Sequence, residues 1–191
     1  MICGRTAHKK RKAIKKYNLF CGEATKGSYI LLIKLARGKD ILIGKLGYIH
    51  FPKAFYAYVG SAMSGFKARL AHHLKDSKKP HWHIDYLLKE ADLVDIILCP
   101  SEPFASCHSE RSEESHGTQG RLRMECFLAQ ALAREFQSIP NFGSSDCKCK
   151  SHLYFTNDKG KLRAKVAKAM DKSGLPYKIS PVGGKKNGIG I

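Results

Sequence analysis

The sequence lacks any long hydrophobic run. No segment approaches the roughly 18–20 consecutive apolar residues that a membrane-spanning helix needs. Residues 1–16 carry positive charge, but the apolar stretch that would follow in a secretory signal peptide is missing. We therefore expect a protein that is not secreted and that has no membrane partner.

Acidic residues are scarce in this chain. Asp and Glu number 16 against 34 Lys and Arg, which gives a formal net charge of +18 at neutral pH. Such a field attracts polyanions, and nucleic acid is the commonest polyanion in the cytoplasm. Basic tails also serve solubility or contact with membrane surfaces. The composition therefore predicts a nucleic-acid partner without defining an activity.

The cysteines cannot form a complete set of internal disulfides, because there are seven of them. In a chain that is not secreted they indicate a reducing compartment, which favours the cytoplasm. Three cysteines and one histidine offer a structural zinc set, namely Cys126, Cys147, Cys149 and His152. The Cys-x-Cys spacing is tighter than that of most zinc sites. Buried free thiols beside a packed histidine are the alternative.

The length of 191 residues and the 43% hydrophobic content predict one domain with tails. We assign residues 1–26 to a basic arm, 27–156 to the folded domain, and 157–191 to a basic helix and tail. Residues 101–120 are polar and without period, so we expect a disordered insertion there. Hydrophobic patterning predicts strands at 27–35, 41–43, 55–60, 93–99 and 151–155. It predicts helices at 84–91, 124–136 and 159–172, and another that begins with Ser64 as its cap.

Two tyrosines stand on the predicted strands, Tyr29 on the first and Tyr58 on the third. The helix that follows Tyr58 carries Arg69, His72 and His73, which we place on the face opposite its apolar stripe. Arginine binds phosphate oxygens with two parallel hydrogen bonds and stays charged at any working pH. The pattern therefore indicates a phosphate site. Tyrosines packed in a core, beside a solvated helix face, are the alternative.

Several blocks of the sequence resemble the GIY-YIG nuclease signature, especially its Uri-like branch. The short matches are Gly27-Ser28-Tyr29 and Tyr58-Val59-Gly60, followed by Gly65 and Arg69. The longer blocks are GKLG at 44–47, YAYVGSA at 56–62, ARLAHH at 68–73, HWHIDYLL at 81–88 and FGSSDCKCKSHL at 142–153. The resemblance covers most of residues 27–155 and skips the insertion.

The resemblance implies an α/β (α+β) domain in which a small mixed or antiparallel central sheet is flanked by helices. It implies catalytic roles for Tyr29, Tyr58, Arg69 and His73, with Glu125 holding one Mg²⁺ or Mn²⁺ ion. A hard ion of this kind keeps several waters, so one carboxylate from the protein suffices. We also predict a set of substrate contacts. These are Gly60, Lys67, His72, His83 and Asp85.

The predicted function is a metal-dependent endonuclease that hydrolyses phosphodiester bonds, in DNA rather than RNA, in repair or recombination. Some Uri-like domains are fused to DNA-repair enzymes, so the resemblance implies a repair enzyme as a protein partner. One alternative is a catalytically weak nucleic-acid-binding module of the same fold, because the insertion just before Glu125 could displace that residue. Another is a zinc-organised interaction domain.

Overall fold

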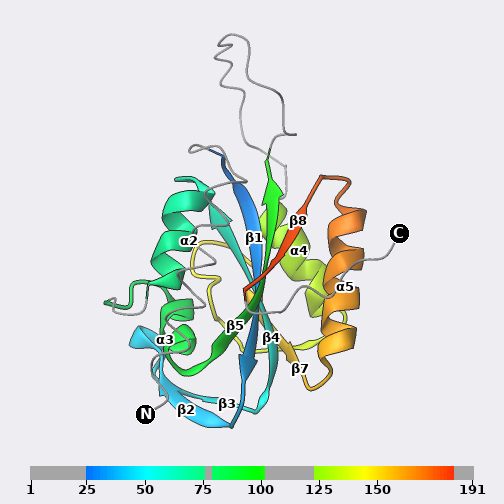
Figure 1. Cartoon of the computed structure of the whole chain (residues 1–191). Coiled ribbons are helices and arrows are strands. Elements are labelled where there is room, and N and C mark those ends of the chain that lie inside the picture. The colour runs from blue at the N-terminus through cyan, green and yellow to red at the C-terminus, as the bar shows by residue number, and fades with distance from the viewer. Residues whose placement is uncertain (1–24, 76–78, 102–122, 183–191) are drawn as a thin grey trace.

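A computed structural model describes residues 25–75, 79–101 and 123–182. Six strands form one antiparallel sheet in the order β6-β7-β4-β1-β5-β8 (Figure 1). The sheet strands are β1 (Gly27–Leu35), β4 (Ala54–Ala62), β5 (Asp92–Pro100), β6 (Gln137–Ser138), β7 (Leu153–Thr156) and β8 (Lys178–Pro181). A separate two-stranded sheet contains β2 (Lys39–Leu42) and β3 (Tyr48–Phe51), joined through the short helix η1 (Gly44–Leu46).

The strand β1 lies at the centre of the sheet. It is apolar on both alternating faces, and eight of its nine residues are buried. It pairs with β4 on one edge and with β5 on the other, in a register that sets Tyr29 opposite Gly60. A strand covered on both faces favours such a continuous apolar run. Tyr29 therefore lies on a buried strand that is paired along both of its edges.

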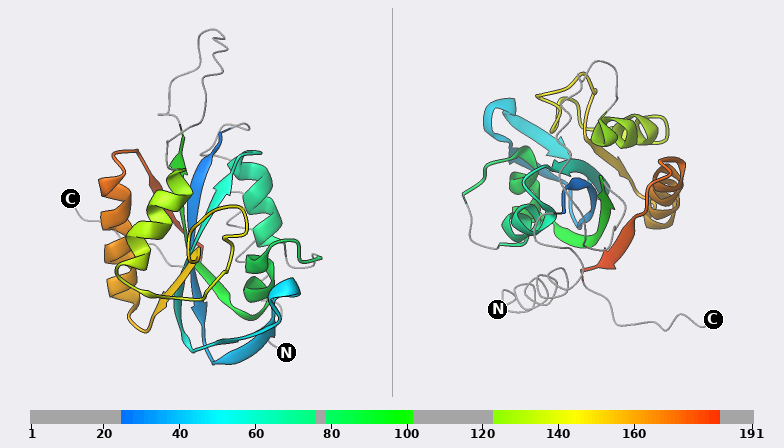
Figure 2. Two further views of the ribbon diagram at one scale, coloured as in Figure 1. Left: turned by 180° about the vertical axis from the view of Figure 1, so that it is seen from behind. Right: turned by 90° about the horizontal axis from the view of Figure 1, so that it is seen from above.

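Helices cover both faces of the sheet (Figure 2). On one face lie α2 (Phe66–Leu74), α3 (His83–Glu90) and the β2-β3 sheet, and on the other lie α4 (Met124–Ala133) and α5 (Lys159–Lys172). Each face has its own hydrophobic core. The predicted α+β architecture, a small antiparallel sheet flanked by helices in a single domain, is confirmed.

Some boundaries differ from the prediction. Helix α2 begins at Phe66 with Gly65 as its N-cap and no side-chain cap, so Ser64 does not cap it. The helix predicted at 159–172 is α5, whose N-cap Asp158 accepts a hydrogen bond from the backbone of Lys161. Strands β3, β6 and β8 were not predicted.

The C-terminal helix is part of the packed body. Leu162, Val166 and Met170 of α5 are buried against the sheet, in the same core as α4. The bulk of the predicted N-terminal arm, nearly all of the insertion and the last nine residues lie outside the described residues. In the part that is described, no helix has both the length and the apolar character needed to cross a membrane.

Candidate active site

A polar cavity of about 370 Å³ opens beside the first residues of β1, between α2 and the starts of α3 and α4. Its lining comes from six parts of the chain: Tyr29, Tyr58, Gly60, Ser61, Arg69, His81, Trp82, His83, Glu125, Gly143, Ser145, Asp146 and His152. Five residues were predicted to carry catalysis or to hold the Mg²⁺ or Mn²⁺ ion, and four of them reach this cavity. They are Tyr29, Tyr58, Arg69 and Glu125.

The two tyrosines lie side by side on neighbouring strands, with ring centroids 6.3 Å apart. Gly60 makes room for the side chain of Tyr29, because a Cβ atom at that position would lie 2.6 Å from the Tyr29 hydroxyl. Tyr29 is 2% exposed and Tyr58 7%. Burial is the main cause of a pKa above the usual tyrosine value for both, and the positive charge of Arg69 opposes it without reversing it. Both phenols are therefore protonated at neutral pH.

Tyr29 begins a chain of buried polar side chains. Its hydroxyl lies 2.8 Å from Nε2 of His73, and Nδ1 of that histidine lies 3.4 Å from Oδ1 of Asp85. All three residues are at most 3% exposed. A carboxylate facing Nδ1 favours the tautomer with its proton on that nitrogen, which leaves Nε2 free to accept from the Tyr29 hydroxyl. The arrangement can move a proton away from the cavity.

Arg69 is held over the face of Trp82, with its guanidinium carbon 3.9 Å from the ring centroid. Stacking of this kind fixes the plane of the guanidinium and stabilises its charge. The ring of Trp82 also meets His72 and His81 edge-on, at centroid distances of 4.6 Å each. The cavity thus presents one oriented cation.

Glu125 lies in the first turn of α4 and is 6% exposed. Its carboxylate lies 3.7 Å from Nη1 of Arg123, and the same nitrogen lies 3.3 Å from Asp146. Two carboxylates therefore flank one exposed arginine at the cavity wall. Oxygen donors of this type suit a hard divalent ion.

A cluster of sulfur and nitrogen donors adjoins the same wall. The ligand atoms of Cys126, Cys147, Cys149 and His152 all lie within 4.8 Å of one another, so the cluster could hold a metal ion. Burial, the largest cause, raises the pKa of the Cys126 thiol to about 12 and also raises that of Cys149. The pKa of His152 is lowered, chiefly by burial. These groups are neutral at neutral pH, so the histidine is ready to bind a metal and the thiols must first lose their protons.

One family model matches the chain, over residues 28–175, and its description is domain of unknown function DUF123. The chain belongs to the DUF123 family. No curated protein and no solved structure matches it. The assignment to the GIY-YIG nucleases, including the Uri-like branch, is therefore wrong, because DUF123 is a distinct family. The matched part of the DUF123 domain contains every residue of the cavity.

Some of the predicted substrate contacts line the cavity of this DUF123 domain, and others do not. Gly60 and His83 line the cavity, and Nδ1 of His83 accepts a hydrogen bond from the backbone of Gly143 at 3.2 Å. Lys67 and His72 do not line it. Asp85 does not line it either, since it is fully buried and accepts hydrogen bonds from the backbone nitrogens of His81 and Trp82.

The position of His73 also differs from the prediction. Its side chain lies on the buried side of α2 rather than opposite the apolar stripe, since it is 3% exposed. The reason is its hydrogen bond to Tyr29, which satisfies the ring inside the core. His73 therefore reaches the cavity only through Tyr29.

Sequence reasoning missed several residues of the DUF123 cavity. The contact of Trp82 with Arg69 was not predicted, although the ring of Trp82 stacks under the guanidinium. A single tryptophan between polar residues was the one available signal. Ser61 lies near the end of β4, and Ser145 and Asp146 lie in a loop that has no helical or strand period to mark them.

Proposed function

We propose that this DUF123 domain hydrolyses phosphodiester bonds in nucleic acid, with DNA as its substrate. The observation that carries the proposal is the convergence of Tyr29, Tyr58, Arg69 and Glu125 on one cavity from four different elements. A net charge of +18 supports a polyanionic substrate. None of these residues alone would distinguish a catalytic cavity from a binding groove, but together they supply each part that the reaction needs.

Arg69 supplies positive charge to the phosphate. During attack by water, negative charge builds up on the phosphoryl oxygens, and a cation already fixed in place stabilises it without reorganisation. The stacking of Arg69 on Trp82 provides that fixation. Tyr58 lies beside the attack position and can donate a hydrogen bond to a phosphate oxygen, because burial keeps its hydroxyl protonated.

Tyr29 acts as a proton carrier in this proposal rather than as a free base. Because its pKa is raised, Tyr29 is protonated at neutral pH and cannot take up a proton as a phenolate would. As the attacking water bonds to phosphorus, its proton passes to the Tyr29 oxygen while the Tyr29 proton passes to Nε2 of His73. The resulting imidazolium is stabilised by Asp85, which lies next to Nδ1. The leaving oxygen takes a proton from solvent.

The donors at the cavity wall fit one hard divalent ion. Glu125 is buried enough to be held in place, and Asp146 adds a second carboxylate on the same side. We propose that they hold Mg²⁺ or Mn²⁺ in the working enzyme. When bound, such an ion neutralises phosphoryl oxygens and acidifies water.

Cleavage of labelled linear and branched DNA in Mg²⁺ or Mn²⁺ tests the proposal. We expect Arg69→Ala to lower the rate about 10²–10³-fold, because the fixed charge is lost. Tyr29→Phe and Glu125→Gln are expected to lower it by about 10² or more. The matched controls are Arg134→Ala and Tyr48→Phe, both on exposed positions away from the cavity, and they should cut like the wild type.

Two outcomes would overturn the hydrolase proposal. If all three cavity variants still cut DNA, the cavity is not the active site. Binding of DNA that weakens with salt, without any cutting, would instead favour the catalytically weak nucleic-acid-binding module.

We also propose that the metal in the cluster of Cys126, Cys147, Cys149 and His152 is zinc. Three thiolates and one imidazole are the preferred donors of structural zinc, which binds sulfur at about 2.3 Å and nitrogen at about 2.0 Å. The cluster joins the first turn of α4 to the loop before β7, and that loop supplies Gly143, Ser145 and Asp146 to the cavity. Zinc would hold this wall in place.

Elemental analysis of the purified protein tests the zinc assignment. We expect about one zinc per chain, lost in Cys147→Ser and Cys149→Ser but kept in Cys99→Ser, because Cys99 is a buried thiol in the core between the sheet and α4. Removal of the metal with a chelator is expected to lower the melting temperature of the wild type. A metal-free wild type that melts at the same temperature with and without added zinc contradicts the assignment.

A further inference from the structure

A second and larger cavity lies on the opposite face of the sheet, between α5 and the strands β5 and β8. Its volume is about 800 Å³, within the range of roughly 300–1,000 Å³ that holds small-molecule ligands. We call it the α5 slot. It shares no lining residue with the candidate active site.

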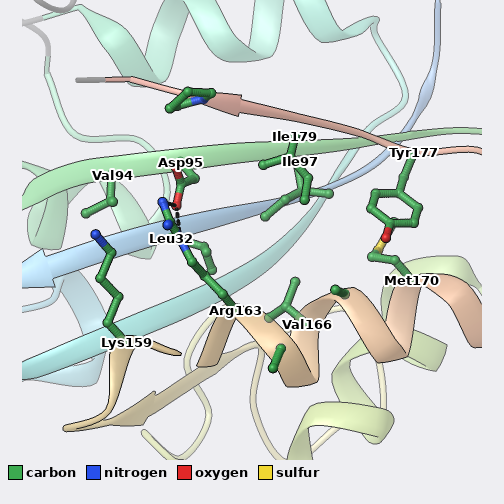
Figure 3. A pocket seen from close by; sticks show the side chains of 13 residues that line it. Leu32, Val94, Asp95, Ile97, Lys159, Arg163, Val166, Met170, Tyr177 and Ile179 are labelled. Atoms are coloured by element: carbon green, nitrogen blue, oxygen red, sulfur yellow. Dashed lines mark hydrogen bonds and ion pairs between the residues drawn. The ribbon is translucent and has the colours of Figure 1, made fainter. Parts of the chain in front are cut away.

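The α5 slot is polar at one end and apolar along the rest (Figure 3). Lys159, Arg163 and Asp95 lie at one end. Val166 and Met170 follow along α5 toward the other end, where Tyr177 reaches in from the segment before β8. From Lys159 to Met170 the helix rises about 16 Å, so the slot is elongated. The hydroxyl of Tyr177 bonds to Asp171 at 2.9 Å, so its polar end is satisfied outside the slot.

The charges at the polar end do not balance. Asp95 is 1% exposed, and Nε and Nη2 of Arg163 both donate to its Oδ2, at 2.8 and 2.5 Å. Nη1 of Arg163 is left for another acceptor, and Lys159 has no partner among the residues that the structure describes. The positive charge of Lys159 is therefore uncompensated, and it lies at the same end of the slot as Arg163, which the buried carboxylate of Asp95 holds in place.

We propose that the α5 slot binds a small amphiphilic oxyanion, with a carboxylate or phosphate head and an elongated apolar body. The head fits between Lys159 and Nη1 of Arg163, where charge-assisted hydrogen bonds are strong. The body lies along Ile97, Val166 and Ile179, and it removes the apolar surface of Ile179 from water, since the other two are already buried. Ile179 is 51% exposed, so covering it with an apolar body is favourable. This site is independent of the proposed hydrolase.

Calorimetric titration of the full chain tests the proposal, with dodecanoate, dodecyl phosphate and dodecanol kept below their micelle concentrations. We expect the two anions to bind and dodecanol to bind at least about tenfold more weakly, because it lacks the charged head. The better of the two anions identifies the head group. Equal binding of dodecanol, or no binding of either anion, overturns the proposal.

Variants locate the site. Lys159→Gln should weaken binding of the anions about tenfold, whereas Lys161→Gln, on an exposed part of the same helix, removes an equal charge outside the slot and should leave it unchanged. Ala167→Trp fills the slot and should abolish binding, with the fold checked by circular dichroism. Equal losses in the two lysine variants would show general charge attraction and overturn the proposal, as would normal binding by Ala167→Trp.

Discussion

At the scale of single residues, the cavity depends on one missing side chain. Gly60 faces Tyr29 across the β1-β4 pair, and its φ angle lies outside the left-handed region, so the close approach of the ring is what requires glycine. A methyl group there would meet both the ring carbon and the oxygen of Tyr29 at 2.6 Å. Tyr29 cannot yield easily, because it is bonded to His73 and packed beside Tyr58.

We expect Gly60→Ala to lower the free energy of unfolding by about 1–3 kcal/mol, the usual cost of overpacking a core. Urea denaturation followed by circular dichroism measures the change. Gly38→Ala is the control, because a Cβ there meets nothing closer than 3.6 Å. A Gly60→Ala variant as stable as the wild type would show that Tyr29 moves freely, and the proton path through His73 would then lose its fixed starting point.

Single residues also show what sequence reasoning can reach. Tyr29, Tyr58, Arg69 and Glu125 were predicted from ordered blocks and from helix and strand spacing, and all four line the cavity. The burial of Asp85 was not predicted, because a carboxylate near a helix start is normally solvated. Its position is explained by its backbone hydrogen bonds at the start of α3 together with the tertiary contact with α2, where His72 lies 2.9 Å from it.

At the scale of elements, the first residue of α3 is hydrogen-bonded to the loop that contributes Gly143, Ser145 and Asp146 to the cavity lining. Nδ1 of His83 accepts the backbone hydrogen of Gly143, whose φ of 72° puts the chain in a left-handed turn against Tyr58. Burial lowers the pKa of His83 below its usual value, which keeps the ring neutral and able to accept. Protonation of Nδ1 would remove this hydrogen bond.

The lowered pKa predicts a pH dependence. The unfolded chain binds a proton at His83 more readily than the folded one, so this residue stabilises the fold above its unfolded pKa of about 6.5. That contribution is lost as the pH falls through the lower pKa of the folded state. Melting temperatures between neutral and mildly acidic pH should therefore fall more steeply for the wild type than for His83→Asn, which keeps an acceptor near the Nδ1 position. The exposed His50→Asn should follow the wild type, and identical slopes for wild type and His83→Asn would contradict the prediction.

Elements differ in how far the sequence predicts them. Long, strongly patterned ones such as β1 and α5 were predicted with their full bounds. The short strands β2 and β7 were predicted with shifted bounds and β3, β6 and β8 not at all, because two to four residues hold too few alternations to show a period. Strand β8 ends in Pro181 and exists because β5 offers it an open edge, which is a tertiary cause.

At the scale of the whole molecule, the sheet separates two unlike chemistries. The candidate active site is polar and lies toward α2 and α3, whereas the α5 slot is mostly apolar and lies under α5. Composition predicts a nucleic-acid partner, which we propose for the first cavity, and gives no sign of the second. Its lining comes from β1, β5, β8 and α5, which are far apart in the sequence, so no local residue pattern marks it.

The central place of β1 has a consequence for how the protein is made. Both strands that pair with it come later in the chain, β4 at residues 54–62 and β5 at residues 92–100. During synthesis, therefore, this largely buried strand leaves the ribosome before both of its partners, and one of its edges stays unpaired until β5 has emerged. An open apolar edge is the kind of surface on which nascent chains associate. The strand that carries Tyr29 is thus exposed to association with other chains until its second partner has been synthesised.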